Sequence, residues 1–183
     1  LAHALQEQSQ KDISFTRQDS EIEVIMSILS NYVPECLVRA KVSCPVSSIP
    51  PQEGTDGSTF AEKIVQAIEI ANCEPHRAVT HNKGIMNGVD ALVLATGNDF
   101  RAIEAGVHAY AARSGQYTSL SQANITDGQF TMELSLPLAI GTVGGLTNLH
   151  PLVKWSMQLL GSPNAMQLME IIAVAGLAQN FGA

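Results

Sequence analysis

The chain has few cationic residues, and they do not gather in any one stretch. Its 183 residues include 10 Lys and Arg against 17 Asp and Glu, so the net charge is −7. Nucleic-acid binding depends on basic patches that contact phosphates, and this charge balance therefore disfavours it. The sequence also lacks any run of 18 apolar residues, so we expect no membrane-spanning helix.

Cysteine is scarce as well. Cys36, Cys44 and Cys73 form no CxxC pair, which disfavours a zinc ribbon, and we expect no metal site. Cys36 and Cys44 fall on the same face of an alternating segment and are expected to be small core residues. The odd number of cysteines suggests a reducing, cytoplasmic setting. No GxGxxG occurs, so no Rossmann-type nucleotide site is predicted.

What remains is the composition of a globular protein with a substantial core. Apolar residues make up 45% of the chain and charged residues 15%, and the length suits one domain, or one domain and part of another. Alternation of apolar and polar residues predicts strands at 21–29, 36–44 and 129–138. Helices are expected from Ser58 or Thr59 to about 71, at 100–113 after a cap at Asn98 or Asp99, at 151–160 and at 164–180.

Periodicity does not decide whether residues 84–96 form a buried helix or a strand. The mixture of elements lacks the regular βαβ alternation of a doubly wound sheet. It therefore predicts an α+β fold.

The stretch from 77 to 101, RAVTHNKGIMNGVDALVLATGNDFR, concentrates the candidate chemistry. Lys83 and Asp99 lie at opposite ends of an apolar run and could form a charged pair in a pocket, within hydrogen-bonding distance or one water apart. Such pairs shift pKa values and are common at catalytic sites. The alternative is an exposed Lys in a loop and an Asp that only caps a helix. Arg77 could bind a carboxylate through its guanidinium fork, or could be a surface Arg in a weak ion pair.

Four motifs carry a family resemblance: RAVTHNKGIMNGVDA, LATGNDFRAIEAGVHAYAARSGQY, GTVGGLTNLHP and GLAQNFGA. Together they resemble the catalytic core of 3-hydroxy-3-methylglutaryl-coenzyme A (HMG-CoA) reductase in its bacterial, class II form. The resemblance implies that residues 1–31 are the tail of a ferredoxin-like cofactor domain. Residues 32–183 would then be most of an α+β substrate-binding domain.

The resemblance also implies roles for the charged residues of this stretch. Lys83 would polarise the thioester carbonyl of HMG-CoA and later the aldehyde carbonyl, with Asp99 orienting it. Arg77 would hold the free carboxylate of the substrate. By its spacing of four residues from Lys83, Asn87 could also hold and aim the ammonium and so lie near the substrate. Weaker candidates follow from the resemblance: Gln179 and Asn180 near the substrate, and Asn31 near the nicotinamide.

The implied reaction reduces HMG-CoA to mevalonate and CoA, or runs in reverse, with NADH or NADPH in a homodimer or higher oligomer. The cofactor motif of the family and its catalytic Glu would precede residue 1, and its catalytic His would follow residue 183. We therefore expect an internal fragment that is inactive alone. Two alternatives are a cysteine-dependent acyl transferase like the thiolases, and a non-catalytic dimerisation or scaffold fragment that retains the fold.

Overall fold

The computed structural model describes residues 25–52, 54–144 and 149–182, and the chain divides into two compact units, residues 1–30 and 31–183. In the first unit, residues 25–30 are exposed and belong to no helix or strand. The strand predicted at 21–29 is therefore wrong for 25–29, while residues 21–24 lie outside the described part. The rest of the description concerns the second unit.

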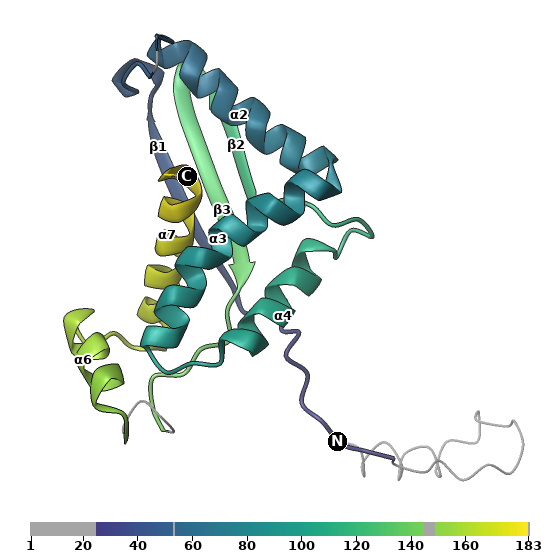
Figure 1. Ribbon diagram of the computed structural model, residues 1–183, viewed down its shortest axis with the longest axis vertical. Coiled ribbons are helices and arrows are strands. Elements are labelled where there is room, and N and C mark those ends of the chain that lie inside the picture. Colours follow the sequence, from purple (N-terminus) through teal and green to yellow (C-terminus); the bar gives the residue numbers. More distant parts are fainter. Residues whose placement is uncertain (1–24, 53, 145–148, 183) are drawn as a thin grey trace, which may run out of the picture. The chain divides into compact units, whose positions relative to one another are not determined.

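A three-stranded antiparallel sheet forms one layer of this unit (Figure 1). Its order is β1 (Leu37–Pro45), β3 (Gln129–Pro137), β2 (Ser121–Thr126). The strands predicted at 36–44 and 129–138 are confirmed to within one residue. Strand β2 was not predicted, although the sequence contains a signal for it. Asp127 and Gly128 have φ of 52° and 73°, and an Asp-Gly pair in this conformation is typical of a two-residue hairpin turn.

Alternation along the strands separates a buried face from an exposed one. In β1, Val38 and Ala40 are buried while Arg39 and Lys41 are exposed. Cys44 is half-buried and packs against the core. The prediction that Cys36 is a core residue is wrong, because it lies in the bend before β1 and is exposed.

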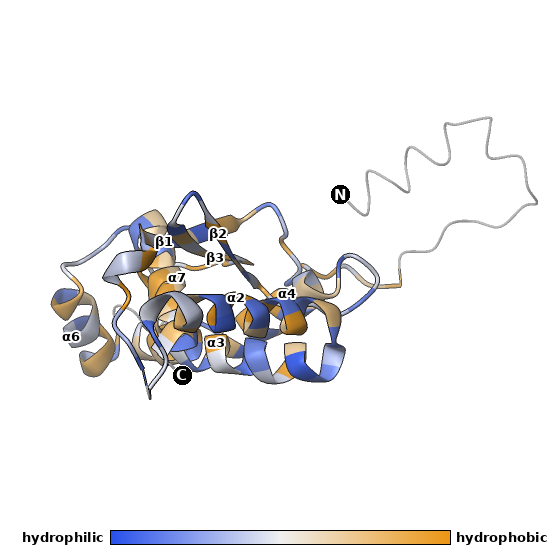
Figure 2. Ribbon diagram, turned by 90° about the horizontal axis from the view of Figure 1, so that it is seen from above, coloured by the Kyte–Doolittle hydropathy of each residue, from blue (hydrophilic) through white to orange (hydrophobic). Residues whose placement is uncertain are grey.

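Five helices and one short 3-10 turn (Val46–Ser48) complete the described part of the chain. They are α2 (Gly57–Cys73), α3 (Pro75–Ala95), α4 (Phe100–Ala111), α6 (Pro151–Leu159) and α7 (Ala165–Gly182). Helices α2, α3 and α7 lie on one side of the sheet (Figure 2). Helices α2 and α7 contact the strands, and α3 packs along α7. The α+β prediction is confirmed, and no described helix has the length and apolar character needed to cross a membrane.

The residues at the starts of α2 and α3 explain the outcomes of two further predictions, the cap of α2 and the state of residues 84–96. Asp56 caps α2 by accepting hydrogen bonds from the N–H groups of Ser58 and Thr59, so the cap precedes the two residues that we expected. Glu74 caps α3, and Pro75 occupies the first turn, where its missing N–H costs nothing. Because α3 continues for 21 residues to Ala95, the ambiguous segment 84–96 is helical.

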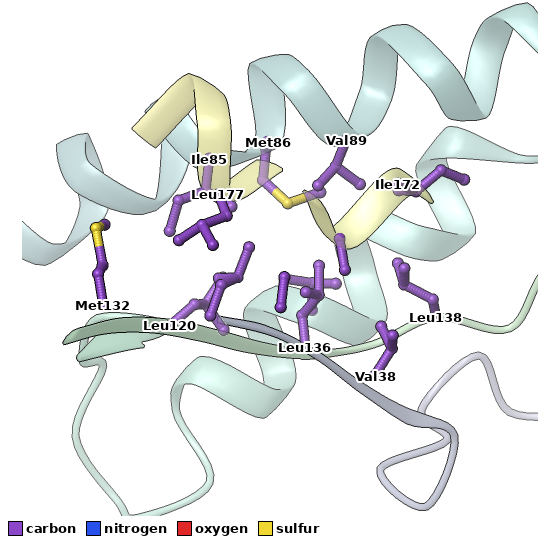
Figure 3. Packing of buried hydrophobic residues seen from close by; sticks show 14 of the residues in the cluster. Val38, Ile85, Met86, Val89, Leu120, Met132, Leu136, Leu138, Ile172 and Leu177 are labelled. Carbon is purple, nitrogen blue, oxygen red and sulfur yellow. The ribbon is translucent and has the colours of Figure 1, made fainter. Parts of the chain in front are cut away.

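The core lies between helices α3 and α7 on one side and the sheet on the other. In Figure 3, side chains of α3 and α7 point toward those of the sheet and of the residues that flank it. From the helices come Ile85, Met86, Val89, Ile172 and Leu177, and from the sheet side come Val38, Leu120, Met132, Leu136 and Leu138. Glycines let α3 and α7 approach closely, because a Cβ added to Gly88 would lie 2.6 Å from the backbone oxygen of Ala175.

Where α3 faces α4, two carboxyl groups share a partly buried site. Burial, followed by a hydrogen bond with Glu104 and repulsion from its charge, raises the pKa of Asp90 to about 7. The Asp90 Oδ1 atom is buried and has no hydrogen-bond partner among the described residues. The folded state therefore retains a proton on Asp90 that the unfolded chain loses near pH 4.

We expect Gly88→Ala to lower the free energy of unfolding by about 1–2 kcal/mol, since the clash with α7 outweighs the helix propensity gained. Gly84 on the same helix is the matched control, because a Cβ there would meet no atom within 4 Å. Gly84→Ala should raise stability by up to about 1 kcal/mol. Urea unfolding measures both, and equal effects would show that the contact with α7 is not tight.

A second prediction concerns pH. Asp90 has a raised pKa in the folded state, so its contribution to stability is lost as pH rises from about 4 through about 7. Asp90→Asn should therefore stabilise the chain by about 1–2 kcal/mol at pH 8, after allowance for solvent screening, and by much less at pH 4. Asp127→Asn, in the exposed hairpin turn, is the control. A gain in stability for Asp90→Asn that is the same at both pH values would contradict the raised pKa of Asp90 in the folded state.

Candidate active site around helix α3

The HNKG motif lies in the middle of α3, and the helix separates its residues onto two faces. His81 and Asn82 are buried, whereas Lys83 is exposed and so is Asn87, one turn further on. No hydrogen bond or ion pair joins the Lys83 ammonium to another described residue. Lys83 is therefore presented to solvent by a rigid helix, neither in a loop nor in a buried charged pair.

Asn82 ties this part of α3 to the chain that leads into β2. Its side chain has an exposure of 0%. The amide nitrogen donates to the Thr118 carbonyl at 2.9 Å, and the amide oxygen accepts from the Leu120 N–H at 2.9 Å. We did not identify Asn82 from the sequence. The sequence nevertheless contained a signal that Asn82 is buried. Asn82 precedes Ile85 and Met86 by three and four residues, and residues at these spacings lie on the same face of a helix.

A pocket of about 470 Å³ opens where α2, α3 and the end of α7 meet. Helix α2 supplies an apolar wall, and polar groups come from α3 and α7. The lining residues are Phe60, Ile64, Ala67, Ile68, Arg77, Thr80, His81, Gly84, Met132, Asn180 and Phe181. An apolar wall beside a guanidinium suits a ligand with a short carbon chain and a carboxylate.

Two of the predicted substrate residues, Arg77 and Asn180, line this pocket. Both are half-buried. The other two do not line it: Asn87 is exposed on the outer face of α3, and Gln179 is exposed beside Gly88, where its Cβ packs against that helix. A second pocket of about 210 Å³, on the polar face of the sheet, contains none of the predicted site residues.

His81, to which the sequence assigned no role, lies at the base of the pocket with 6% exposure. Its Nε2 atom is 2.7 Å from the Ser121 Oγ atom on β2. Burial, and to a lesser extent the charge of Arg77, lower the pKa of His81 to about 4. The imidazole is therefore neutral at physiological pH.

Asp99 has the capping role that the sequence suggested for it. It begins α4, and its Oδ1 atom accepts from the N–H groups of Arg101 at 3.0 Å and Ala102 at 3.2 Å. Its side chain is 61% exposed, and the Arg101 Nε atom is 3.8 Å away. Asp99 is thus a surface carboxylate on a well-defined helix end.

The prediction that Lys83 and Asp99 approach each other is wrong for a single chain. Twelve helical residues separate Lys83 from the end of α3 at Ala95, and a rise of 1.5 Å per residue makes this about 18 Å. Asp99 lies beyond that end. If the two charged groups meet, they must come from different copies of the chain.

Asn31, the one residue predicted to contact the cofactor, is exposed in a bend, and its backbone oxygen would lie 2.8 Å from a Cβ added to Gly106 of α4. One exposed amide is not by itself a binding site for a dinucleotide. Across the same residues, no three His, Cys, Asp or Glu side chains are grouped to bind a metal.

Comparisons with known proteins agree with this geometry. The family model described as hydroxymethylglutaryl-coenzyme A reductase matches residues 5–183. The reductase of Archaeoglobus fulgidus is 39% identical over 183 residues, which is all of this chain and 40% of that protein.

Solved structures give the same result. The HMG-CoA reductase of Streptococcus pneumoniae superposes with a TM-score of 0.81 and 45% identity, covering 86% of this chain and 38% of that one. A class II enzyme from the same organism, bound to NADPH in open conformations, has the same score and identity and covers 86% of this chain and 43% of the other. The chain thus spans about two fifths of the length of these relatives. Given the motifs, the fold and these matches, the chain belongs to the hydroxymethylglutaryl-coenzyme A reductase family.

Proposed function

We propose that the full-length protein containing this chain reduces HMG-CoA to mevalonate and CoA, or catalyses the reverse reaction, with NADH or NADPH. The observation that carries this proposal is the way α3 presents its motif. Arg77 borders the pocket, and Lys83 stands six residues later with its ammonium in solvent. Six helical residues rise about 9 Å and turn the chain about 240° around the helix axis, and Lys83 does not line the pocket. A ligand whose carboxylate is bound by Arg77 would therefore have to extend out of the pocket for its carbonyl to meet the Lys83 ammonium.

In this function Arg77 binds the substrate carboxylate through two N–H donors. Lys83 stabilises the negative charge that develops on the thioester oxygen and then on the aldehyde oxygen. The nicotinamide, when bound, supplies hydride in two successive equivalents. The Streptococcus pneumoniae class II enzyme bound to NADPH supports this cofactor class.

Asp99 would orient Lys83 from a second copy of the chain, because α3 holds the two residues apart in one copy. An apolar stripe on α6 supports self-association. Leu152, Trp155 and Leu159 are 67%, 59% and 71% exposed and lie at i, i+3 and i+7, on one side of the helix. Contiguous exposed apolar residues of this kind mark interaction surfaces. We therefore propose a homodimer or higher oligomer with its active sites between subunits.

The remaining assignments follow the same proposal. Residues 1–31 would be the tail of the cofactor domain and 32–183 most of the substrate domain, which the division of the chain after Ser30 supports. Asn31 would then lie near the nicotinamide, and Asn87 and Gln179 near the substrate. The three cysteines are free, which supports a reducing cytoplasmic setting.

The alternative is a non-catalytic dimerisation or scaffold fragment. Its support is that one copy of the chain does not bring Lys83 and Asp99 together. Both proposals require self-association, so activity of the full-length protein distinguishes them. The chain alone should show no reductase activity in either case.

Mixing two inactive variants tests the function and the shared site together. Full-length Lys83→Ala and full-length Asp99→Ala should each lose most cofactor oxidation with HMG-CoA. After the two are unfolded and refolded as a mixture, half of the dimers are mixed and each has one intact site. About a quarter of the wild-type activity should therefore return.

Failure of the mixture to recover activity, with an active wild type treated in the same way, would place both residues in one site of one subunit. An inactive wild-type protein would overturn the reductase proposal itself. Either result is read from the loss of cofactor absorbance.

Arg77 allows a separate prediction about binding. Arg77→Ala in the full-length protein should raise KM for HMG-CoA more than it lowers kcat, because a bidentate contact to the carboxylate is lost in the ground state as well as in the transition state. Arg77→Lys should recover only part of the loss, since an ammonium lacks the fork geometry. Arg39→Ala, an exposed Arg of β1 outside this pocket, is the control, and an unchanged KM in Arg77→Ala would remove Arg77 from the site.

A further inference from the structure

Three side chains from three different elements form a closed ring of hydrogen bonds at the base of the pocket. His81 comes from α3, Ser121 from β2 and Asn180 from α7. The His81 Nε2 atom is 2.7 Å from Ser121 Oγ, Ser121 Oγ donates to Asn180 Oδ1 at 3.0 Å, and Asn180 Nδ2 is 3.5 Å from His81 Nδ1. Ser121 is fully buried and His81 nearly so, which excludes water from the centre of the ring.

The donors and acceptors of the ring fix one protonation state of His81. With the Asn180 amide oriented as in the structure, Ser121 donates its single proton to Asn180 Oδ1, and the neighbouring Ser119 hydroxyl donates to the Ser121 carbonyl. The Ser121 oxygen then accepts from His81 Nε2–H. The Nδ1 atom then carries no proton and accepts from the Asn180 amide. A protonated imidazole would place an N–H against the Asn180 NH2 group, near the Arg77 guanidinium. Burial and Arg77 also hold the pKa of His81 at about 4, so the neutral ring is the stable form.

This arrangement leaves Asn180 with one unused donor. An amide has two N–H groups and a carbonyl. The carbonyl accepts from Ser121 and one N–H donates to His81, while no hydrogen bond within the described chain uses the second N–H. Asn180 lines the same pocket as Arg77.

We propose that His81 and Ser121 are positioning residues for Asn180, and that the ring holds the amide so that its free N–H donates to an oxygen of the ligand bound beside Arg77. The proposal rests on the pocket being the substrate site and deepens that assignment. The ligand class is a short hydroxy-carboxylate or its thioester. Its carboxylate binds the Arg77 guanidinium, and a carbonyl or hydroxyl oxygen accepts from the Asn180 amide. Without the ring, the Asn180 amide could rotate and present its carbonyl to that oxygen, which would repel the ligand.

The ring itself is tested by nitrogen-15 NMR of the chain at pH 7, with each histidine assigned through its backbone. The expected spectrum shows His81 as the neutral tautomer protonated at Nε2, unchanged down to about pH 5. Protonation at Nδ1, or a signal averaged between tautomers, would overturn the fixed orientation. This measurement does not depend on reductase activity or on any ligand.

The donor role is tested with 3-hydroxy-3-methylglutarate as the probe, added to the chain and followed by NMR. Asn180→Ala and Ser121→Ala should each weaken binding about 3- to 10-fold, as expected for one hydrogen bond. Ser121→Thr keeps the hydroxyl and should restore wild-type affinity, which a loss of packing alone would not predict. Asn124→Ala, an exposed residue of the same strand, should bind as the wild type does.

The outcomes separate the two proposals. Binding that is unaffected by Asn180→Ala, or not restored by Ser121→Thr, would overturn the positioning role while leaving the pocket as the substrate site. A wild-type chain that does not bind the probe would overturn both the substrate assignment and the donor role, whatever the tautomer of His81.

Discussion

The two hydrogen bonds of the Asn82 side chain are the contact on which the candidate site depends. They join a fully buried amide on α3 to the backbone at Thr118 and Leu120, just before β2. Leaving buried backbone groups without partners would cost about 1–3 kcal/mol each, so α3 has one favourable rotation about its axis. That rotation buries His81 beside Ser121, places Arg77 at the pocket and leaves Lys83 in solvent.

The same helix explains why one copy of the chain does not complete the site. Gly88 allows α3 to pack tightly along α7, and α3 continues past Lys83 to Ala95. A continuous helix of this length holds Lys83 far from Asp99 at the start of α4. Catalysis of the proposed kind requires a carboxylate near the ammonium, and a second subunit can supply it. In the proposed function, the continuous helix that presents Lys83 therefore favours a site shared between two subunits.

Sequence reasoning predicted the parts of this structure that depend on local patterns. Alternation of apolar and polar residues located β1 and β3. Asp99, one of the two residues predicted to cap the helix at 100–113, is the cap. Sequence reasoning failed where tertiary contacts decide. The helical state of 84–96, the exposure of Cys36 and the burial of His81 depend on neighbours that are distant in the sequence. Arg77 and Asn180 meet at one pocket because α3 and α7 pack together, and the family resemblance, not their spacing of over a hundred residues, pointed to both.

Hydrogen exchange at the Leu120 backbone amide tests this account most directly, because that N–H is bonded only to the Asn82 side chain. In the wild-type chain, we expect Leu120 to exchange as slowly as the core amides of β3, through global unfolding. In Asn82→Ala it should exchange far faster, together with a change in the environment of His81. Fast exchange at Leu120 in the wild type would contradict the claim that Asn82 fixes the rotation of α3 and with it the site.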